Sequence, residues 1–246
     1  MELTIVSGLV LIVFSAIFIS ATFGFGDALI NMPLLTLLLG SSDTAPLVAC
    51  LSMFNSGIIF FCDRGAADKK RLFPLLFSAL LAMPLGFYVA KIADEQVVKI
   101  ALGGLIVAFA IYNLFIKQML AVISMPRAGF DPKAIIFGTV SGLFGGAYNI
   151  SGPPVVLYGT LCAWSPLTFS ATLQSFFFPL ACTSVVMRAS FGEYNSQIFI
   201  YFFIALPALI LATLLGRFAN SRITNPARFQ RIIQVMLLFL GLSLFR

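Results

Sequence analysis

The sequence contains no histidine, few charged residues and no closely spaced cysteines. Charged residues make up 10% of the 246 positions, against roughly 25% in soluble domains. A soluble fold of this size needs far more polar surface to cover its core. Without histidine the commonest metal-ligand side chain is missing, so we expect no metal site and no cofactor. The four cysteines lie in or beside apolar segments without C-x-x-C spacing, which is typical of small buried thiols.

Long apolar runs are abundant instead. Hydrophobic residues make up 60% of the chain, and most uncharged stretches approach or exceed the roughly 17–25 residues that a membrane-spanning helix needs. The composition therefore predicts an all-α polytopic membrane protein. The uncharged stretches cover residues 3–26, 28–42, 44–62, 72–90, 100–116, 134–187, 194–216 and 232–245.

The net charge of +6 comes from basic residues in short loops between the apolar runs. This is the distribution that the positive-inside rule describes for membrane proteins. We therefore expect the lipid bilayer and a small solute as partners, and no nucleic acid. The oligomeric state stays open.

Two Gly- and Pro-containing interruptions indicate an internal repeat. One reads GFGDALINMPLL and the other GGAYNISGPPVV. At a spacing of 121 residues, Gly24 aligns with Gly145 and Pro33 with Pro154. Each interruption is followed by a short apolar piece, a turn and three longer apolar segments, so the chain is predicted to contain two copies of one unit.

The loop charges predict that the two units are inverted. In the first unit, most basic residues lie in the loop after the first apolar segment that follows the hairpin. In the second unit, most lie one loop later, so equivalent loops of the two units have opposite charge bias. An inversion requires an odd number of crossings per unit, which a broken hairpin that returns to its starting side provides. With such hairpins, eleven basic residues lie in the cytoplasm and four lie outside. If the chain instead crossed the membrane eight times without hairpins, nine basic residues would lie in the cytoplasm and six outside. The hairpin arrangement agrees better with the positive-inside rule.

The predicted fold is therefore two inverted repeats, each with a broken helical hairpin and three transmembrane helices. The first repeat covers 1–117, a cytoplasmic linker covers 118–133 and the second repeat covers 134–246. The expected elements are a hairpin over 3–39 with helices over 44–62, 72–92 and 97–117, and a hairpin over 134–163 with helices over 166–188, 195–217 and 230–246.

A helix broken inside a membrane leaves backbone groups that lipid cannot satisfy, so the breaks should face the protein interior or a wet cavity. A new helix should begin near Ala28 and another near Ser151, each with free N–H groups and a positive dipole end. Two such ends that meet near the midplane predict an anion site. The alternative is that the glycines only permit close helix packing and that the Asn and Ser side chains only cap helices.

Asp27 is the acid placed deep in an apolar stretch, where a charge is costly and usually functional. One interpretation is an N-cap for a helix that starts at Ala28. The other is a protonatable carboxyl that couples anion movement to a proton. Asn55 and Gln174 are further polar residues at membrane depth that we expect to line the pathway.

The motifs resemble those of the TauE/SafE sulfite exporter family, over nearly the whole chain. The matching residues are Gly24-Phe25-Gly26 with Pro33, and Gly142, Gly145 and Gly146 with Gly152-Pro153-Pro154. The resemblance implies a carrier in the bacterial inner membrane for sulfite or other sulfur-containing organic anions, with the substrate held by the two motif regions. The predicted substrate-binding residues are Gly24, Phe25, Gly26, Asp27, Asn31, Asn55, Gly145, Gly146, Asn149, Ser151, Gly152 and Gln174.

The leading hypothesis is therefore a secondary transporter that exports a small sulfur-containing anion. A passive anion channel and a carrier for another organic anion are alternatives. An intramembrane enzyme would need a nucleophile or an acid–base pair, and one buried aspartate without histidine is a poor basis for it. A purely structural bundle would have little reason to keep polar broken segments.

Overall fold

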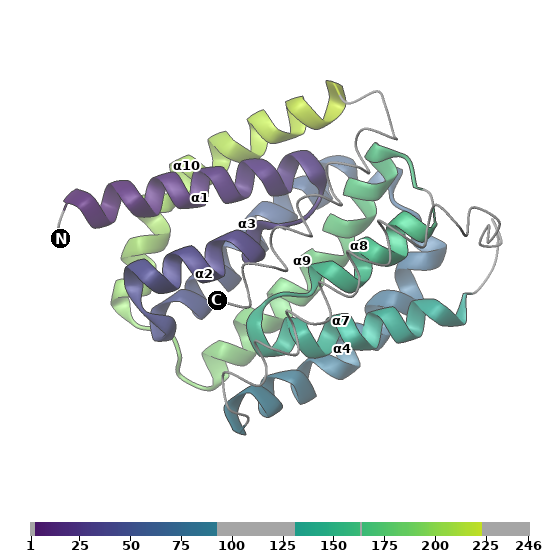
Figure 1. The fold of residues 1–246 in the computed structure, drawn as a ribbon, viewed down its shortest axis with the longest axis horizontal. Coiled ribbons are helices and arrows are strands. Elements are labelled where there is room, and N and C mark those ends of the chain that lie inside the picture. The colour runs from purple at the N-terminus through teal and green to yellow at the C-terminus, as the bar shows by residue number, and fades with distance from the viewer. Residues whose placement is uncertain (1–2, 93–130, 163, 223–246) are drawn as a thin grey trace, which may run out of the picture.

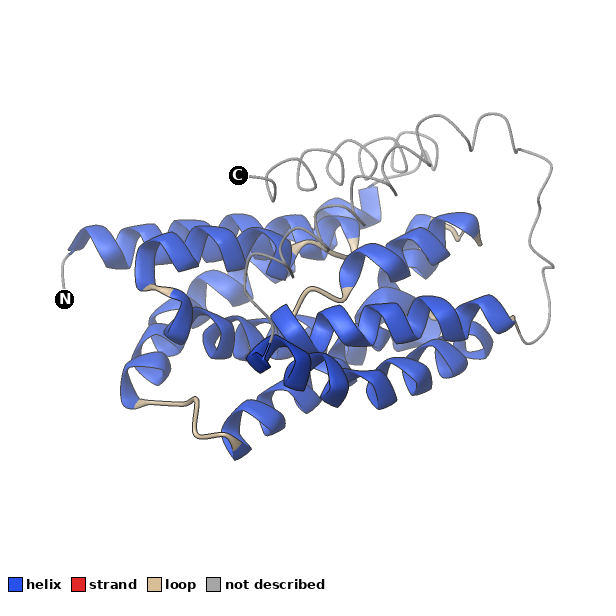
Figure 2. Cartoon of the chain, turned by 60° about the horizontal axis from the view of Figure 1, so that its bottom comes forward, coloured by secondary structure: helices blue, strands red, loops and turns tan. Residues whose placement is uncertain are grey.

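The computed structural model describes residues 3–92, 131–162 and 164–222, and these residues form helices and no strands (Figures 1 and 2). The all-helical prediction is confirmed for this part of the chain. The elements are α1 (Leu3–Phe23), α2 (Asp27–Leu39), α3 (Ser41–Asp63), the 3-10 turn η1 (Arg64–Ala66), α4 (Lys69–Ile92), α7 (Pro132–Tyr148), α8 (Gly152–Leu161), α9 (Pro166–Ser190) and α10 (Ser196–Arg222).

Among the described residues, five helices are long and apolar enough to cross a membrane: α1, α3, α4, α9 and α10. By contrast, α2 has 13 residues and α8 has 10. At about 1.5 Å per residue they extend roughly 20 and 15 Å, well short of a hydrocarbon core about 30 Å thick. The helices expected over 97–117 and 230–246, and most of the expected linker over 118–133, lie outside the described residues.

The two breaks have a local cause in the sequence. Gly24 and Gly26 both have positive φ, at 89° and 111°, a conformation that side chains with a Cβ rarely adopt, so α1 ends and α2 begins there. In the second break Asn149 takes the left-handed conformation at the end of α7. Pro153 and Pro154 then occupy the first turn of α8, where a missing N–H costs least.

Three helix pairs make the most extensive contacts: α4 with α7, α1 with α10, and α3 with α9. Gly138, Gly142 and Gly146 of α7 form a stripe whose missing side chains let the backbone of α4 approach directly. Gly138 lies at Leu75 while Gly146 lies at Met83, so α4 and α7 run parallel.

The helices α1 and α10 are also parallel. Gly216 of α10 packs against Phe18 of α1, and the Asn220 side chain donates a hydrogen bond to the carbonyl of Thr22 at 2.6 Å. The C-terminal ends of the two helices therefore lie together (Figure 1).

The central pair, α3 and α9, runs antiparallel. The start of α3 meets the loop that follows α9, where the Tyr194 hydroxyl donates to the carbonyl of Pro46 at 3.4 Å. The start of α9 meets the loop that follows α3, where the Asp68 amide donates to Thr172 at 2.9 Å.

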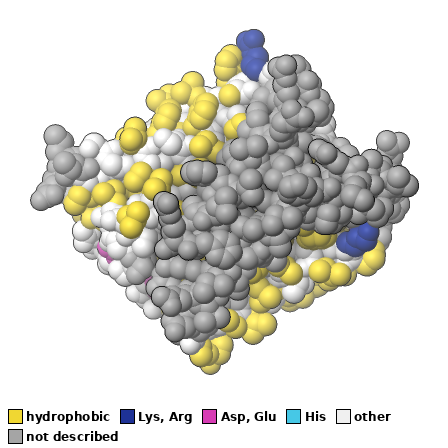
Figure 3. Space-filling view, viewed as in Figure 1, with side chains coloured by type: hydrophobic (Ala, Val, Ile, Leu, Met, Phe, Trp, Pro, Cys, Tyr) yellow, Lys and Arg dark blue, Asp and Glu magenta, His cyan; other side chains and the backbone are white. Residues whose placement is uncertain are grey.

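Large apolar side chains cover the outside of the bundle, as Figure 3 shows along the visible helices. Leu37 is 86% exposed and Phe73 is 72% exposed. Polar residues such as Asn31, Asn55 and Gln174 are buried instead. An apolar exterior around polar interior side chains is the arrangement that a lipid environment favours.

Candidate functional site

A small cavity lies where the two helix breaks meet. Its volume is about 40 Å³, which has room for about three water molecules. Residues from both breaks contribute to its wall, together with α3, α4 and α9. The lining residues are Gly26, Asp27, Ala28, Leu29, Ala49, Ser52, Met83, Gly145, Asn149, Ile150, Ser151, Gly152, Phe177, Leu180 and Ala181.

The α2 side of the cavity carries the aspartate. The helix begins at Asp27 with Gly26 at the N-cap position, so the expectation that Asp27 is the N-cap residue itself is off by one position. The Asp27 carboxyl lies close to the backbone amides of Asp27 and Ala28. The Ser52 hydroxyl is near this carboxyl but makes no hydrogen bond of normal geometry.

The α8 side of the cavity is chemically different. The first turn contains Pro153 and Pro154, which have no N–H, so Gly152 supplies the helix donor that remains there. Ser151 precedes the helix without capping it, and its carbonyl accepts a hydrogen bond from Ser141. The two helix starts are therefore not equivalent: α2 has a carboxylate over its free N–H groups, and α8 offers fewer donors and no charge.

Asn149 is fixed at the cavity edge by residues from both halves of the chain. Its amide nitrogen donates to the carbonyl of Ala45 on α3 at 2.9 Å. Its amide oxygen accepts a hydrogen bond from Ser184 on α9 at 2.5 Å. The second break is thereby attached to the antiparallel α3–α9 pair.

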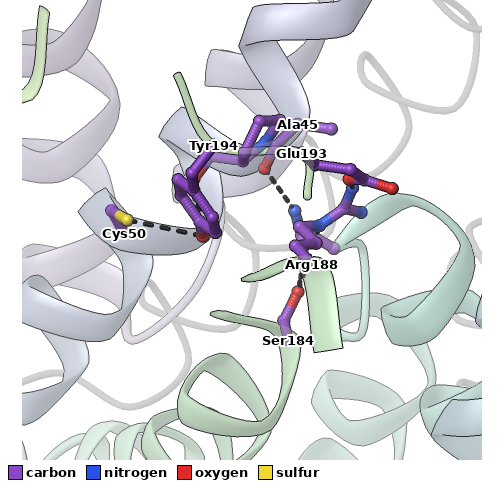
Figure 4. A network of polar contacts seen from close by, with 8 residues as sticks. Ala45, Cys50, Ser184, Arg188, Glu193 and Tyr194 are labelled. Carbon is purple, nitrogen blue, oxygen red and sulfur yellow. Dashed lines mark hydrogen bonds and ion pairs between the residues drawn. The ribbon is translucent and has the colours of Figure 1, made fainter. Parts of the chain in front are cut away.

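This hydrogen-bonded chain continues from the cavity to a buried arginine (Figure 4). Arg188 Nε donates to the Ser184 hydroxyl at 3.4 Å, and Arg188 Nη1 lies 2.7 Å from a carboxylate oxygen of Glu193. On the same side, the Cys50 thiol and the Tyr194 hydroxyl are 3.5 Å apart. A polar connection therefore runs from the cavity wall to the loop between α9 and α10.

Comparison with known proteins adds an independent observation. The family model for the sulfite exporter TauE/SafE matches residues 9–244. The chain belongs to the TauE/SafE family. The match covers almost the whole chain, and members of the family are transporters, so the five apolar helices are those of a multi-pass membrane protein.

A curated relative of this TauE/SafE chain is the probable sulfite/organosulfonate exporter TauE of Cupriavidus necator, with 27% identity over 118 residues. The aligned region is 48% of this chain and 45% of the relative, so the match spans about half the length of each protein. No solved structure matches.

Of the residues predicted to bind substrate in this TauE/SafE protein, six line the cavity and six do not. The lining residues are Gly26, Asp27, Gly145, Asn149, Ser151 and Gly152. The residues outside the described lining are Gly24, Phe25, Asn31, Asn55, Gly146 and Gln174.

Four of the residues outside the lining have clear packing or hydrogen-bonding contacts. Asn55 accepts from Thr213 at 3.0 Å and donates to Ser20 at 3.3 Å. The side-chain amide of Gln174 donates to the carbonyl of Gly24 at 3.1 Å. Gly146 lies against the backbone of α4. For Gly146, close helix packing accounts for the glycine, as the alternative interpretation stated.

Two buried amide side chains carry unpaired polar atoms. Neither amide atom of Asn31 has a hydrogen-bond partner among the described residues, and neither does Oε1 of Gln174. Leaving such a group unpaired costs about 1–3 kcal/mol. Asn31 lies four residues after Asp27 on α2, which places the two side chains on one face of that helix.

The sequence did not predict most of the apolar cavity wall or one polar lining residue, Ser52. Ser52 and Asn55 are both polar residues within the apolar sequence of α3, so the sequence marked both as candidates. In the structure, however, the two side chains face different neighbours. Ala49, Met83 and Phe177 carried no signal because apolar residues are abundant throughout the chain. Within the described ranges, no group of three or more His, Cys, Asp or Glu side chains is placed to hold a metal ion.

Proposed function

We propose that this chain is a secondary transporter that exports a small sulfur-containing anion, such as sulfite or an organosulfonate, across the bacterial inner membrane. The observation that carries the proposal is the single cavity that joins the α1–α2 break to the α7–α8 break. Helix breaks at membrane depth are tolerated where they line such a cavity. Family membership and the name of the C. necator relative support sulfur anions as the substrate class.

The cavity wall offers weak but suitable chemistry for an oxyanion. Ser52 and Ser151 have hydroxyl groups, Gly152 has a backbone N–H, and the α8 N-terminus has a positive dipole end. No Lys or Arg is among the described lining residues. An anion held without a full positive charge is bound loosely, which allows the release that transport requires.

We assign Asp27 the coupling role in this mechanism. An ionised carboxylate in the same small cavity repels an anion, and a protonated carboxyl does not. Binding of the anion then requires a proton on Asp27, so that the two move together. The unpaired Asn31 amide on the same helix face supports a hydrated path to this carboxyl.

The two units of the chain are proposed to be inverted repeats that alternate access to the cavity. The hairpin α1–α2 corresponds to α7–α8, α3 to α9, and α4 to α10. Pairing supports this assignment, because α1 runs parallel to α10 while α7 runs parallel to α4, and α3 is antiparallel to α9. These three pairings are the ones that a twofold axis in the membrane plane would produce.

The test is counterflow in proteoliposomes that contain the purified full chain. We expect labelled sulfite outside to accumulate when the vesicles hold unlabelled sulfite, and sulfoacetate to compete with it. Accumulation driven only by carboxylates would overturn the sulfur-anion assignment. Single-channel conductance without trans-acceleration would show a passive channel instead of a carrier.

A further inference from the structure

Arg188 is a buried cation in the last turn of α9, with only 4% of its surface exposed. A charge at such a position is expensive unless it is paired and hydrogen-bonded, and an arginine inside a membrane protein usually belongs to a substrate path. Its side chain contacts the Glu193 carboxylate, the Ser184 hydroxyl and the ring of Phe87, whose centroid is 5.6 Å from the guanidinium carbon.

The position of Arg188 on α9 connects it to the cavity. Phe177 and Ala181 line the cavity, and Ser184 and Arg188 follow at the spacing that keeps all four side chains on one helix face. From Ala181 to Arg188 the helix rises about 10 Å. Ser184 also bonds Asn149, which is itself part of the cavity wall.

Glu193 is better placed to move than Arg188. Its side chain is 25% exposed and lies in the short loop between α9 and α10, whereas Arg188 is held within a helix. The Phe87 ring contacts the guanidinium independently of Glu193. A cation–π contact of this kind would keep the guanidinium in place when the carboxylate leaves.

We propose that the Arg188–Glu193 ion pair is an anion-exchange gate at the mouth of the cavity on the α9–α10 loop side. This inference rests on the proposed transport of an anion. A sulfur oxyanion displaces the Glu193 carboxylate from Arg188, because its oxygens accept the same guanidinium N–H groups and leave no unpaired buried charge. Neutral solutes and cations cannot make that exchange, so the gate selects for anions before they reach a cavity whose described lining contains no Lys or Arg.

The test measures KM and kcat for labelled sulfite in proteoliposomes for wild type, Glu193→Gln, Arg188→Gln and the double variant Arg188→Gln/Glu193→Gln. Glu193→Gln removes the carboxylate that competes with sulfite for Arg188, so its KM should be at least about threefold lower than that of wild type. Loss of the charge-assisted hydrogen bond should raise KM about tenfold in both variants that lack Arg188. Arg188→Gln alone keeps the Glu193 charge after removing the cation that it pairs with, which can prevent folding. The double variant removes both charges, so its KM tests the gate even if Arg188→Gln does not fold.

The control is Asp63→Asn, which removes a similar ion pair, Asp63 with Arg217 at 2.9 Å, that joins α3 to α10. Its KM should stay at the wild-type value. A double variant whose KM is within twofold of wild type, or a Glu193→Gln variant that behaves like Asp63→Asn, overturns the gate. A wild-type protein that neither transports sulfite nor is thermally stabilised by sulfite or sulfoacetate overturns the proposed function, and the gate with it.

Discussion

Asp27 illustrates why the chemistry of this cavity depends on single residues. It is a carboxylic acid next to hydroxyl groups and helix N-termini that would otherwise suit an anion. Its contacts with the amides of Asp27 and Ala28 satisfy part of the α2 start. The helix-capping interpretation and the proton-coupling interpretation are therefore compatible, because one carboxyl can do both in different protonation states.

Replacement of Asp27 by Asn separates the two roles. Asparagine still accepts backbone hydrogen bonds but cannot take up or release a proton. We expect Asp27→Asn to fold normally and to transport sulfoacetate, whose charge stays nearly constant from pH 5 to pH 8, at a rate that no longer varies with pH. The measurement is the initial counterflow rate from pH 5 to pH 8. Asp43→Asn, at an exposed hydrogen bond with Asn195, is the matched control, and an Asp27→Asn profile equal to that of wild type would rule out the coupling role.

Ser52 and Ser56 offer a second comparison at this scale. Both lie on α3, but Ser52 lines the cavity and the Ser56 hydroxyl donates back to the carbonyl of Ser52 within the helix. A hydrogen bond to a charged ligand contributes about 1.5–3 kcal/mol. We expect Ser52→Ala to raise the KM for sulfite roughly tenfold and Ser56→Ala to leave it unchanged. Equal KM values for the two variants would mean that Ser52 does not touch the substrate.

At the scale of elements, the two broken hairpins are built from the same plan with different chemistry. The break between α1 and α2 uses two glycines with positive φ and an acid, whereas the break between α7 and α8 uses a left-handed Asn149 and two prolines. Prolines remove donors from the α8 start, and the acid occupies donors at the α2 start. The anion is therefore expected to lie nearer the α8 side.

The contact between α4 and α7 depends on close packing along the glycine stripe of α7 and not on a single hydrogen bond. A Cβ at Gly142 would overlap the carbonyl of Ala79, whereas one at Gly8 of α1 would meet only Leu38 at an ordinary 3.4 Å. Gly→Ala in an open helix stabilises by about 1 kcal/mol, and overpacking costs about 1–3 kcal/mol.

We therefore expect the two substitutions to have opposite signs. Gly142→Ala should lower the Tm of the detergent-solubilised protein, and Gly8→Ala should leave it unchanged or raise it. Thermal unfolding of the purified variants measures both. A Tm for Gly142→Ala at or above the wild-type value would mean that α4 and α7 do not pack through this glycine stripe.

At the scale of the whole molecule, the antiparallel α3–α9 pair separates two loops. The loop after α3 contains η1, and the loop after α9 leads into α10 at Ser196. Because each loop meets the start of the opposite helix, the two loops lie at opposite ends of the bundle. By the positive-inside rule, Lys69 and Lys70 at the first loop predict that this loop faces the cytoplasm.

Single cysteines test this orientation. In a variant without the four native cysteines, Gly65→Cys and Ser196→Cys introduce thiols at exposed positions. We expect a membrane-impermeant maleimide added to intact cells to label Ser196→Cys and to label Gly65→Cys only after lysis. Labelling of both thiols from the same side would contradict the inverted topology.

The sequence by itself determined the membrane-embedded all-helical fold and the positions of the two breaks. These follow from local physics: apolar runs must lie in lipid, and Gly24, Gly26, Pro153 and Pro154 restrict the backbone wherever the chain places them. The position of Asp27 at a cavity was also predictable, because an acid inside an apolar run has few other stable surroundings.

Only the tertiary structure decided which polar residues face the cavity. Ser52 and Asn55 are one helical turn apart, yet one lines the cavity and the other bonds α1 and α10, because their neighbours come from distant segments. The connection from Asn149 to Arg188 likewise depends on the packing of the α7–α8 break against α9. Side chains so far apart in the chain come into contact through packing, which no local pattern encodes.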